Sequence, residues 1–366
     1  MIEIDPLTDP RWETFLAAHP DRRVYHHPAY LECVRREYGQ PAVNLACEDA
    51  GGQLRGILPL LYTKPFPFRL GGGPARRLSS LPRTPVGGPL VLDHAAYDTL
   101  MGAAIARVQG DPDTLLEVRM ACEAVDAPRH GGQAIAQFPS YVLTLPAKGQ
   151  TLRFGSPRNH SAIHRAVNKS IKSGIQIHEA QTERELRAWY WLYLETHRWH
   201  ARQRAIPARS YEFFKACLDT MQPKGLARLL LAVRPGTGRG EIVAGSFMFM
   251  YGKSTIYGYN GRRQDALDLR PNDAIHWRAI HDAHESGYSE YDFGDVGPEN
   301  EGLARFKKKW GAEPHPQWRY YYPAPAATPS KGTGGPTLSR RVRNALCSRA
   351  PLAIWALHSS LLRRYM

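Results

Sequence analysis

The chain has 366 residues, a formal net charge of +14 and a hydrophobic fraction of 43%. This length and apolar content are those of a globular protein with room for two domains and a tail. The five cysteines lack any Cys-x-x-Cys spacing, which argues against a disulfide framework or a zinc site and favours a reducing cytoplasm. No run approaches the ~18 apolar residues of a membrane-spanning helix, and the acidic start predicts no signal peptide.

The positive charge is concentrated in two segments. Residues 324–366 contain seven basic residues and no acid, and residues 153–174 contain five basic residues and no acid. Such segments favour polyanionic partners, which include nucleic acid, anionic lipid and phosphorylated substrates. The alternative is that each cluster is simply a solvated surface.

The predicted elements follow the same order twice along the chain. Residues 44–62 predict a hairpin, 95–110 a helix and 114–120 a strand; residues 228–261 then predict a meander, 272–287 a helix and 288–294 a strand. This repetition predicts an α/β fold with mixed sheets, built from two copies of one unit. We expect domains at residues 1–150 and 151–323.

The C-terminal residues predict a linker and a tail. Residues 324–337 are rich in Pro, Gly, Ser and Thr, as flexible linkers are. Residues 338–366 predict a basic amphipathic helix whose apolar centre surrounds Trp355. Its composition suits a helix lying on the anionic inner surface of the cell membrane. Docking on the protein's own core is the alternative.

A short helix near residue 300 raises a question about one lysine. Asn300 is a suitable N-cap and Gly311 a suitable residue after the C-cap. At 100° per residue, the apolar face is formed by Leu303, Phe306 and Trp310. Lys307 falls on the same face. Its side chain either extends along that face to solvent or is buried for a chemical reason.

Four segments resemble the Fem-type transferases and their acyltransferase relatives. They read YHHPAYLECVRREYG, SPRNHSAIHRAVNKSIKSGIQIH, LRPNDAIHWRAIHDAHESGYSEYDFG and GLARFKKKWG. The resemblance covers roughly residues 12–322 and implies two tandem GNAT-like domains. It also implies transfer of an aminoacyl group from aminoacyl-tRNA to an amine of a lipid-linked or nucleotide-linked cell-wall precursor. A related branch is thought to use acyl-CoA in exopolysaccharide pathways.

The resemblance places the catalytic residues in the last segment. In the Fem family the pair matching Phe306 and Lys307 is implicated at the reacting carbonyl, with the lysine beside the developing negative charge. Asp292 and Asp295 precede this pair and are our candidates for positioning or deprotonating the amine, although an Asx-type turn is an equal alternative for Asp295. Substrate-assisted proton transfer is also open.

Cations are required for a phosphorylated acceptor or donor. By position, Arg35 or Arg36 corresponds to an N-terminal lysine that contacts precursor phosphates in the family. Further candidate substrate-binding residues lie at the start of the second domain, after its meander and at the start of the short helix: Arg158, Arg165, Lys169, Arg262, Arg263, Arg270 and Asn300. On a helix, Arg165 and Lys169 are i, i+4 neighbours.

One departure bears on the donor. Ordinary GNAT enzymes hold the coenzyme A pyrophosphate with an R/Q-x-x-G-x-G/A loop at a helix N-terminus, whereas residues 268–277 read DLRPNDAIHW. Pro271 also removes a backbone donor. This favours aminoacyl-tRNA as the donor, although the polysaccharide branch lacks the loop as well. The resemblance implies a peptidoglycan precursor as the acceptor, and we expect no bound cofactor or metal. Acyl-CoA-dependent N-acylation of an amino sugar, and a non-catalytic RNA- or membrane-binding module, are the alternatives.

Overall fold

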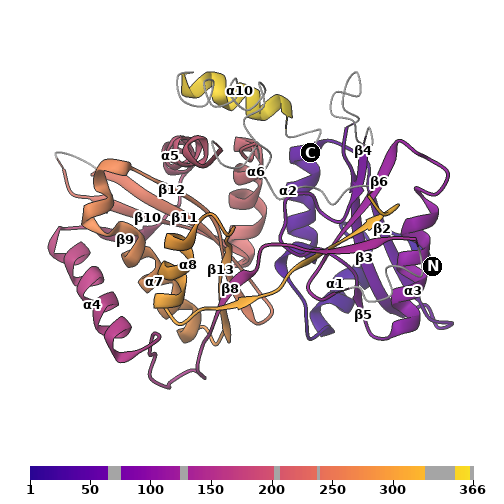
Figure 1. Ribbon diagram of the computed structural model, residues 1–366, viewed down its shortest axis with the longest axis horizontal. Coiled ribbons are helices and arrows are strands. Elements are labelled where there is room, and N and C mark those ends of the chain that lie inside the picture. The colour runs from indigo at the N-terminus through magenta and orange to yellow at the C-terminus, as the bar shows by residue number, and fades with distance from the viewer. Residues whose placement is uncertain (65–75, 124–130, 202–206, 237–239, 326–350, 363–366) are drawn as a thin grey trace. The chain divides into compact units, whose positions relative to one another are not determined.

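The computed structural model describes residues 1–64, 76–123, 131–201, 207–236, 240–325 and 351–362. The chain divides into two compact units (Figure 1). Unit 1 comprises Met1–Phe138, Pro316–Gly334 and Leu361–Met366, and unit 2 comprises Pro139–His315 and Gly335–Ser360. Each unit has its own sheet and its own hydrophobic core.

Unit 1 is a mixed sheet with helices on both faces (Figure 1). Its strands follow the order β1-β2-β3-β4-β6-β15-β7, and β5 pairs with β3. The bounds are β1 Ile2–Glu3, β2 Ala42–Glu48, β3 Leu54–Tyr62, β4 Arg76–Ser79, β5 Leu90–Val91, β6 Thr114–Met120, β7 Gln133–Ala136 and β15 Trp318–Tyr322, with helices α1 Pro10–Ala18, α2 Pro28–Tyr38 and α3 His94–Ala106 and a helical turn at Val24–His26. Leu100 and Met101 of α3 pack on Leu45 and Leu58 of the sheet.

Unit 2 has a sheet in the order β14-β8-β13-β12-β11-β10-β9. Its strands are β8 Ser140–Thr144, β9 Gln176–Glu179, β10 Ala227–Arg234, β11 Glu241–Tyr251, β12 Ser254–Arg262, β13 Glu290–Asp295 and β14 Glu313–His315. Its helices are α4 Pro157–Lys172, α5 Glu183–Ala201, α6 Tyr211–Ala216, α7 Pro271–Glu285 and α8 Glu301–Lys309, with helical turns at Cys217–Met221, Gln222–Lys224 and Gln264–Leu269.

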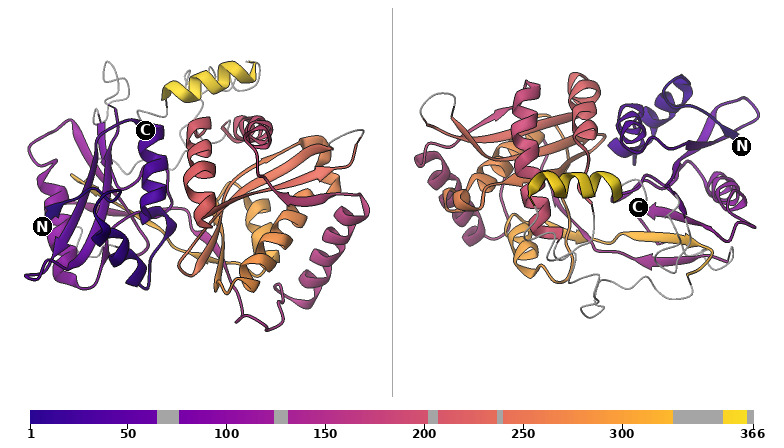
Figure 2. Two further views of the ribbon diagram at one scale, coloured as in Figure 1. Left: turned by 180° about the vertical axis from the view of Figure 1, so that it is seen from behind. Right: turned by 90° about the horizontal axis from the view of Figure 1, so that it is seen from above.

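The two faces of this second sheet bury different helices (Figures 1 and 2). On β11, Phe247 packs against Trp189 of α5 and Phe214 of α6. The next residue, Met248, belongs to the core formed with Ile275 of α7. This alternation is the period-2 pattern of a strand buried on both faces.

Two neighbouring strands of unit 2, β12 and β13, diverge at one end. The parallel strands β12 and β13 pair from Ser254–Glu290 to Ile256–Asp292, yet β12 continues to Arg262. On its other side β13 pairs with β8, with an irregularity between Asp292 and Asp295. The end of β13 therefore leaves the β12 ladder, and its backbone carbonyls need other partners.

The boundary between the units differs from the expected one at residue 150. The chain passes from unit 1 to unit 2 between Phe138 and Pro139, and returns to unit 1 at Pro316. The reason is strand pairing: β8 pairs with β13 and β14, whereas β15 lies between β6 and β7. Such non-local pairing has no signature in local composition.

The tail is described only in part. α10 spans Leu352–Leu362, while most of the expected linker and the start of the expected tail helix lie outside the described residues. Trp355 is buried, whereas Ile354, Leu357 and Leu361 are exposed. Among the described helices, none is both long enough and apolar enough to cross a bilayer.

Candidate active site

The corner between β13 and α8 is shaped by two glycines. Gly294, near the end of β13, has φ +79, and Gly311, just after α8, has φ +91, a backbone region that favours glycine. The amide of Gly311 donates to the carbonyl of Lys308, which closes the helix. The predicted helix end is therefore confirmed, and the two turns fix α8 beside the end of β13.

Lys307 is the buried residue of α8, with 4% of its surface exposed. Its ammonium donates hydrogen bonds to the carbonyl oxygens of Phe293, Gly294 and Asp295, at 2.6, 2.8 and 3.3 Å. All three residues follow Ile256–Asp292, the last pair of the β12–β13 ladder. The side chain thus does not extend to solvent, and its charge lies inside the corner.

The apolar face of α8 differs in part from the predicted one. Trp310 is fully buried and Phe306 is half-buried, as expected, but Leu303 is 42% exposed. The prediction for Leu303 was wrong because only the C-terminal half of α8 packs on the core. Phe306 lies 5.5 Å from the ring of His276, measured between ring centroids.

The two candidate aspartates have different surroundings. Asp292 is buried, and its Oδ1 accepts hydrogen bonds from the Ser140 hydroxyl and, at 2.8 Å, from the Gly294 amide. Asp295 is exposed at the end of β13, and its carbonyl is one of the Lys307 acceptors. The structure therefore brings Asp292, Asp295, Phe306 and Lys307 together at one corner.

His276 is a site residue that the sequence interpretation missed. It is buried on α7, its Nδ1 lies 2.9 Å from the Tyr291 hydroxyl, and its ring lies between Tyr257 and Phe293. Burial, reinforced by the charges of Lys307 and Lys309, lowers the pKa of His276 to about 3, so the ring is neutral near pH 7. The helical period of the sequence indicates only that His276 lies on the buried face of α7, and gives no sign of a role at the site.

A carboxylate side chain of the protein itself lies in the first turn of α7. Asp273 lies in this turn and is buried. Its Oδ1 lies 2.9 Å from the Nζ of Lys309, and the two groups form an ion pair. Arg270 precedes the helix with φ +58, and Pro271 is its first residue. Among the described residues, no side chain makes a capping bond to α7, whereas in unit 1 Asp93 caps α3 by accepting from the Ala96 amide at 2.8 Å. A carboxylate near a helix N-terminus satisfies the same partial positive charge that would attract a phosphate.

The remaining predicted substrate-binding residues of unit 2 are dispersed. Arg158, Arg165 and Lys169 lie exposed on α4. Arg262 lies at the end of β12, where its backbone amide donates to Thr196, and Arg270 is exposed before α7. Asn300 occupies the N-cap position of α8, but its side chain makes no capping bond and instead donates to Glu299.

In unit 1, Arg35 and Arg36 both pair with Glu32, at 2.6 and 2.7 Å. Arg35 also lines a cavity of about 300 Å³ between the start of the chain and α2. Both arginines thus have a carboxylate partner within their own helix.

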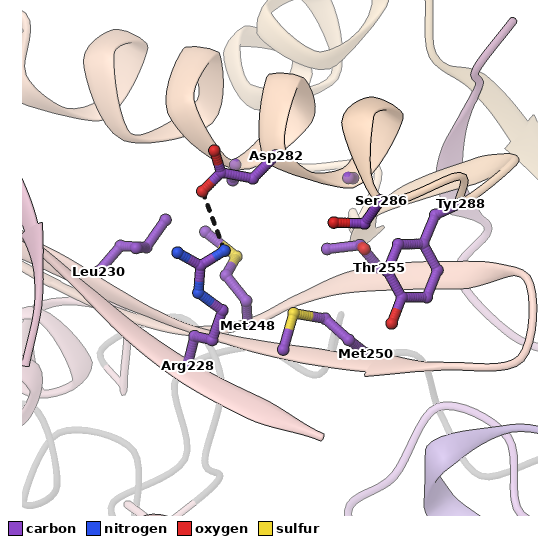
Figure 3. Close-up of a pocket in the computed structure, with 10 residues that line it drawn as sticks. Arg228, Leu230, Met248, Met250, Thr255, Asp282, Ser286 and Tyr288 are labelled. Atoms are coloured by element: carbon purple, nitrogen blue, oxygen red, sulfur yellow. Dashed lines mark hydrogen bonds and ion pairs between the residues drawn. The ribbon is translucent and has the colours of Figure 1, made fainter. Parts of the chain in front are cut away.

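Two kinds of candidate site can be set aside in unit 2. A cavity of about 20 Å³ between α7 and strands β10 to β12 is lined by Met248 and Met250 and flanked by the Arg228–Asp282 ion pair (Figure 3). Its volume is that of one or two water molecules, which is too small for an acyl donor. Within the described ranges, no group of three or more His, Cys, Asp or Glu residues is placed to hold a metal ion.

Residues 158–308 match the family described as an acetyltransferase (GNAT) domain. The match extends from α4 to the lysine-bearing turn of α8 and thus includes Lys307. The chain carries a GNAT acyltransferase domain, and the protein is an acyltransferase, as the sequence predicted. No curated protein sequence matches the chain.

The structure is similar to that of FemX over most of the chain. The TM-score is 0.61 at 16% identity, over 88% of this chain and 97% of FemX. The C-terminal domain of a putative lysylphosphatidylglycerol synthetase from Agrobacterium fabrum has a TM-score of 0.53 at 10% identity, over 85% of this chain and 90% of that domain. A tandem GNAT protein of the clavulanic acid pathway has a TM-score of 0.50 at 12% identity, over 87% and 96%. At such identities the similarity concerns the fold, and the predicted pair of tandem GNAT-like domains is confirmed.

Proposed function

We propose that this acyltransferase moves an aminoacyl group from aminoacyl-tRNA to an amine of a peptidoglycan precursor at the cytoplasmic side of the membrane. The observation that carries the choice of donor is the pair of carboxylates at the N-termini of α3 and α7. These helices follow the antiparallel strands in each GNAT-like unit, where ordinary GNAT enzymes hold the coenzyme A pyrophosphate.

The electrostatic argument concerns Asp93 and Asp273. A diphosphate placed at either helix N-terminus would meet a carboxylate that is already fixed by an ion pair. Asp93 at the start of α3 pairs with Arg55 of β3, and Asp273 at the start of α7 pairs with Lys309 of α8. Like charges at close range repel more strongly where solvent is excluded. The conflict is therefore greater at the buried Asp273 than at Asp93, whose side chain is 39% exposed. A donor whose phosphates bind on another surface avoids this conflict, and aminoacyl-tRNA is such a donor.

The reaction itself requires a neutral amine and a stabilised oxyanion. The amine nitrogen attacks the ester carbonyl, a C–N bond forms, and the C–O bond to the tRNA ribose breaks. The charge of Lys307 lies beside the carbonyls at the end of β13. Its three N–H groups already bond those carbonyls, so it favours the negative charge that grows on the reacting oxygen through the field of its ammonium. Asp295, exposed at the same corner, accepts the proton that the amine loses and passes it to the ribose oxygen as the C–O bond breaks; Asp292 is the alternative acceptor.

The acceptor assignment rests on the Fem-type sequence motifs together with the fold similarity to FemX. Peptidoglycan precursors are carried by a membrane lipid or a nucleotide, so both forms are phosphorylated. We assign the phosphate contacts of the acceptor to Arg35, Arg36, Arg262, Arg270 and Asn300. Arg35 and Arg36 must then exchange or share Glu32 when the acceptor binds.

Attachment to the inner leaflet is proposed for the tail. Ile354, Leu357 and Leu361 are 51%, 61% and 62% exposed, and they fall on one face of α10 at 100° per residue. From residue 324 onward the sequence carries seven basic residues and no acid. An exposed apolar face with basic flanks suits an anionic bilayer surface.

Donor consumption tests the proposal. The protein is incubated with a UDP-linked muropeptide and either labelled aminoacyl-tRNA, with and without RNase, or labelled acetyl-CoA. We expect label transfer from the tRNA, abolished by RNase. Transfer from acetyl-CoA to an amino sugar would instead support the second candidate, which the acetyltransferase description of the matching family favours. RNA binding without any transfer would indicate a non-catalytic module.

A further inference from the structure

One face of α4 is a row of four cations. At 100° per residue, Arg158, Arg165, Lys169 and Lys172 fall within an arc of about 60°. All four side chains are exposed, and α4 contains no acidic residue. The opposite face of the helix is buried through Ile163 and Val167.

The charge of this row is not neutralised by the described parts of the protein. Elsewhere in unit 2, Arg228 pairs with Glu179 and Asp282, and Arg263 pairs with Glu241 and Asp265. For the four cations of α4, no ion pair with any described carboxylate is present. A row of exposed cations at helical spacing concentrates positive potential along a line.

The row begins beside the candidate active site. Gly155, just before α4, has φ +52, and a Cβ atom added there would lie 2.9 Å from the carbonyl oxygen of Lys309. Phe154 packs its ring 5.1 Å from that of Trp310. The N-terminus of α4 is therefore in contact with the C-terminal end of α8, two residues beyond Lys307, and the row leads away from that corner.

We propose that this face of α4 binds the phosphate backbone of the RNA portion of the donor, and this rests on the proposed aminoacyl-tRNA-dependent function. From Arg158 to Lys172 the helix rises about 21 Å, a length that spans several successive phosphates of one RNA strand. An RNA strand held along the row would have one end at the corner that carries Lys307, where the aminoacyl ester must react.

A membrane surface fits this face less well. A helix that lies on a bilayer presents apolar side chains beside its cations, whereas the apolar side chains of α4 at Ile163 and Val167 face the core. Ile171 is exposed, but it is a single residue about 130° from the centre of the row. The observations therefore favour RNA.

The test measures binding of deacylated tRNA by fluorescence anisotropy across a range of salt concentrations. The variant is Arg165→Gln/Lys169→Gln/Lys172→Gln. The matched control, Lys148→Gln/Arg184→Gln/Lys224→Gln, removes the same charge from three other exposed positions of unit 2. We expect the α4 variant to reduce the slope of log K against log salt by roughly 2 to 3 and the control to reduce it by less than about 1.

Two results would overturn the inference. Equal loss of tRNA affinity in the variant and the control would mean that only net charge matters. Unchanged tRNA affinity in the variant, with loss of binding to vesicles of 30% phosphatidylglycerol in phosphatidylcholine, would assign α4 to the membrane instead.

Because this assay involves no transfer, it separates the two proposals. If the wild-type protein binds deacylated tRNA through α4 yet consumes only acetyl-CoA, the proposed function fails while the RNA-binding face remains. If it consumes aminoacyl-tRNA and the α4 variant binds and reacts as the wild type does, only the present inference fails.

Discussion

Both units contain a helix that connects two parallel strands, but the polar groups around the second strand differ between the units. In unit 1 the crossover is β4–α3–β6, and in unit 2 it is β12–α7–β13. In both, a carboxylate lies at the N-terminus of the connecting helix. The difference lies at the end of the second strand of each crossover.

In unit 1 an ion cluster within the sheet extends from the middle of β6 toward this end. Glu117 of β6 is fully buried and lies 3.1 Å from Arg77 of β4, 2.7 Å from Arg119 of β6 and 3.7 Å from Arg319 of β15. Burial alone raises the pKa of Glu117, but the three guanidinium charges outweigh it and hold that pKa below its ordinary value.

In unit 2 the corresponding end receives Lys307 from α8, a helix that follows β13, whereas β7 follows β6 in unit 1. Its ammonium bonds three neutral carbonyl oxygens rather than joining a cluster of strand residues. The comparison indicates that the polar cluster of unit 1 stabilises the sheet, while the added helix of unit 2 supplies the chemistry. Each prediction below tests that division.

The largest effect is expected for Glu117→Gln. Removing the carboxylate leaves Arg119 buried without its charge partner, and breaking a buried pair of this kind typically destabilises by about 3 to 5 kcal/mol. Urea unfolding measures the change, with the exposed Glu123→Gln as a control near zero. An unfolding midpoint equal to that of the wild type would show that the cluster is dispensable.

Lys307→Ala tests the other half of the comparison. We expect turnover to fall by roughly two decades or more, since loss of one oxyanion-stabilising group typically raises the barrier by about 3 kcal/mol. The substitution also removes the donor to three carbonyls and so lowers the stability of the variant. Rates are therefore measured below the thermal unfolding midpoint of the variant. Lys308→Ala, one residue away and exposed, is the control. Normal turnover in a folded Lys307→Ala protein would remove the lysine from the mechanism.

A pH effect is expected from one buried histidine in each unit. Burial lowers the pKa of His26 to about 4 and that of His276 to about 3, whereas an unfolded histidine titrates near 6.5. The unfolded chain therefore binds more protons, so stability is complete above pH ~6.5 and falls as the pH drops from there toward the folded values. At pH 5 each histidine accounts for about 2 kcal/mol.

Unfolding midpoints at pH 7.5 and pH 5 measure this loss. We expect His276→Gln and His26→Gln each to lose less stability between pH 7.5 and pH 5 than the wild type does, because each substitution removes the contribution of one histidine. If His276→Gln loses as much stability on acidification as the wild type, the ring is not kept neutral by its surroundings.

The smallest effect concerns how α8 is anchored. Ser156 caps α4 by accepting from the Asn159 amide at 3.2 Å, and Ser156→Ala should destabilise by about 1 kcal/mol. Asn300 makes no such bond, so Asn300→Ala should change stability by less than about 0.5 kcal/mol. Thermal unfolding compares the two. A larger loss for Asn300→Ala would mean that its cap, and not Lys307, holds α8 in place.

Local features of the site were predictable because they depend on short spacings. The strand ending near Gly294, the helix ending before Gly311 and the position of Lys307 on the buried face all follow from dihedral preferences and the helical period. The pairing of Arg35 and Arg36 with Glu32 also has a sequence signal, since the residues are three and four apart on one helix.

The remaining features depend on tertiary contacts. Leu303 is exposed because the core ends before the first turn of α8, and the helical period contains no information about that limit. His276 resembles an ordinary buried position until Tyr291 and Lys307 are placed beside it. The unit boundary at Phe138 depends on which strands pair across the chain, and no local composition specifies it.

The return of β15 to the first sheet has a consequence for synthesis on the ribosome. β15 lies between β6 and β7, so the sheet of unit 1 lacks an internal strand until residue 322 has emerged. At ~5 to 20 residues per second, the roughly 200 residues after β6 require on the order of 10 to 40 seconds. During that interval β6 and β7 present open edges that invite pairing with other chains, and a fragment cut after Phe138 would keep them permanently.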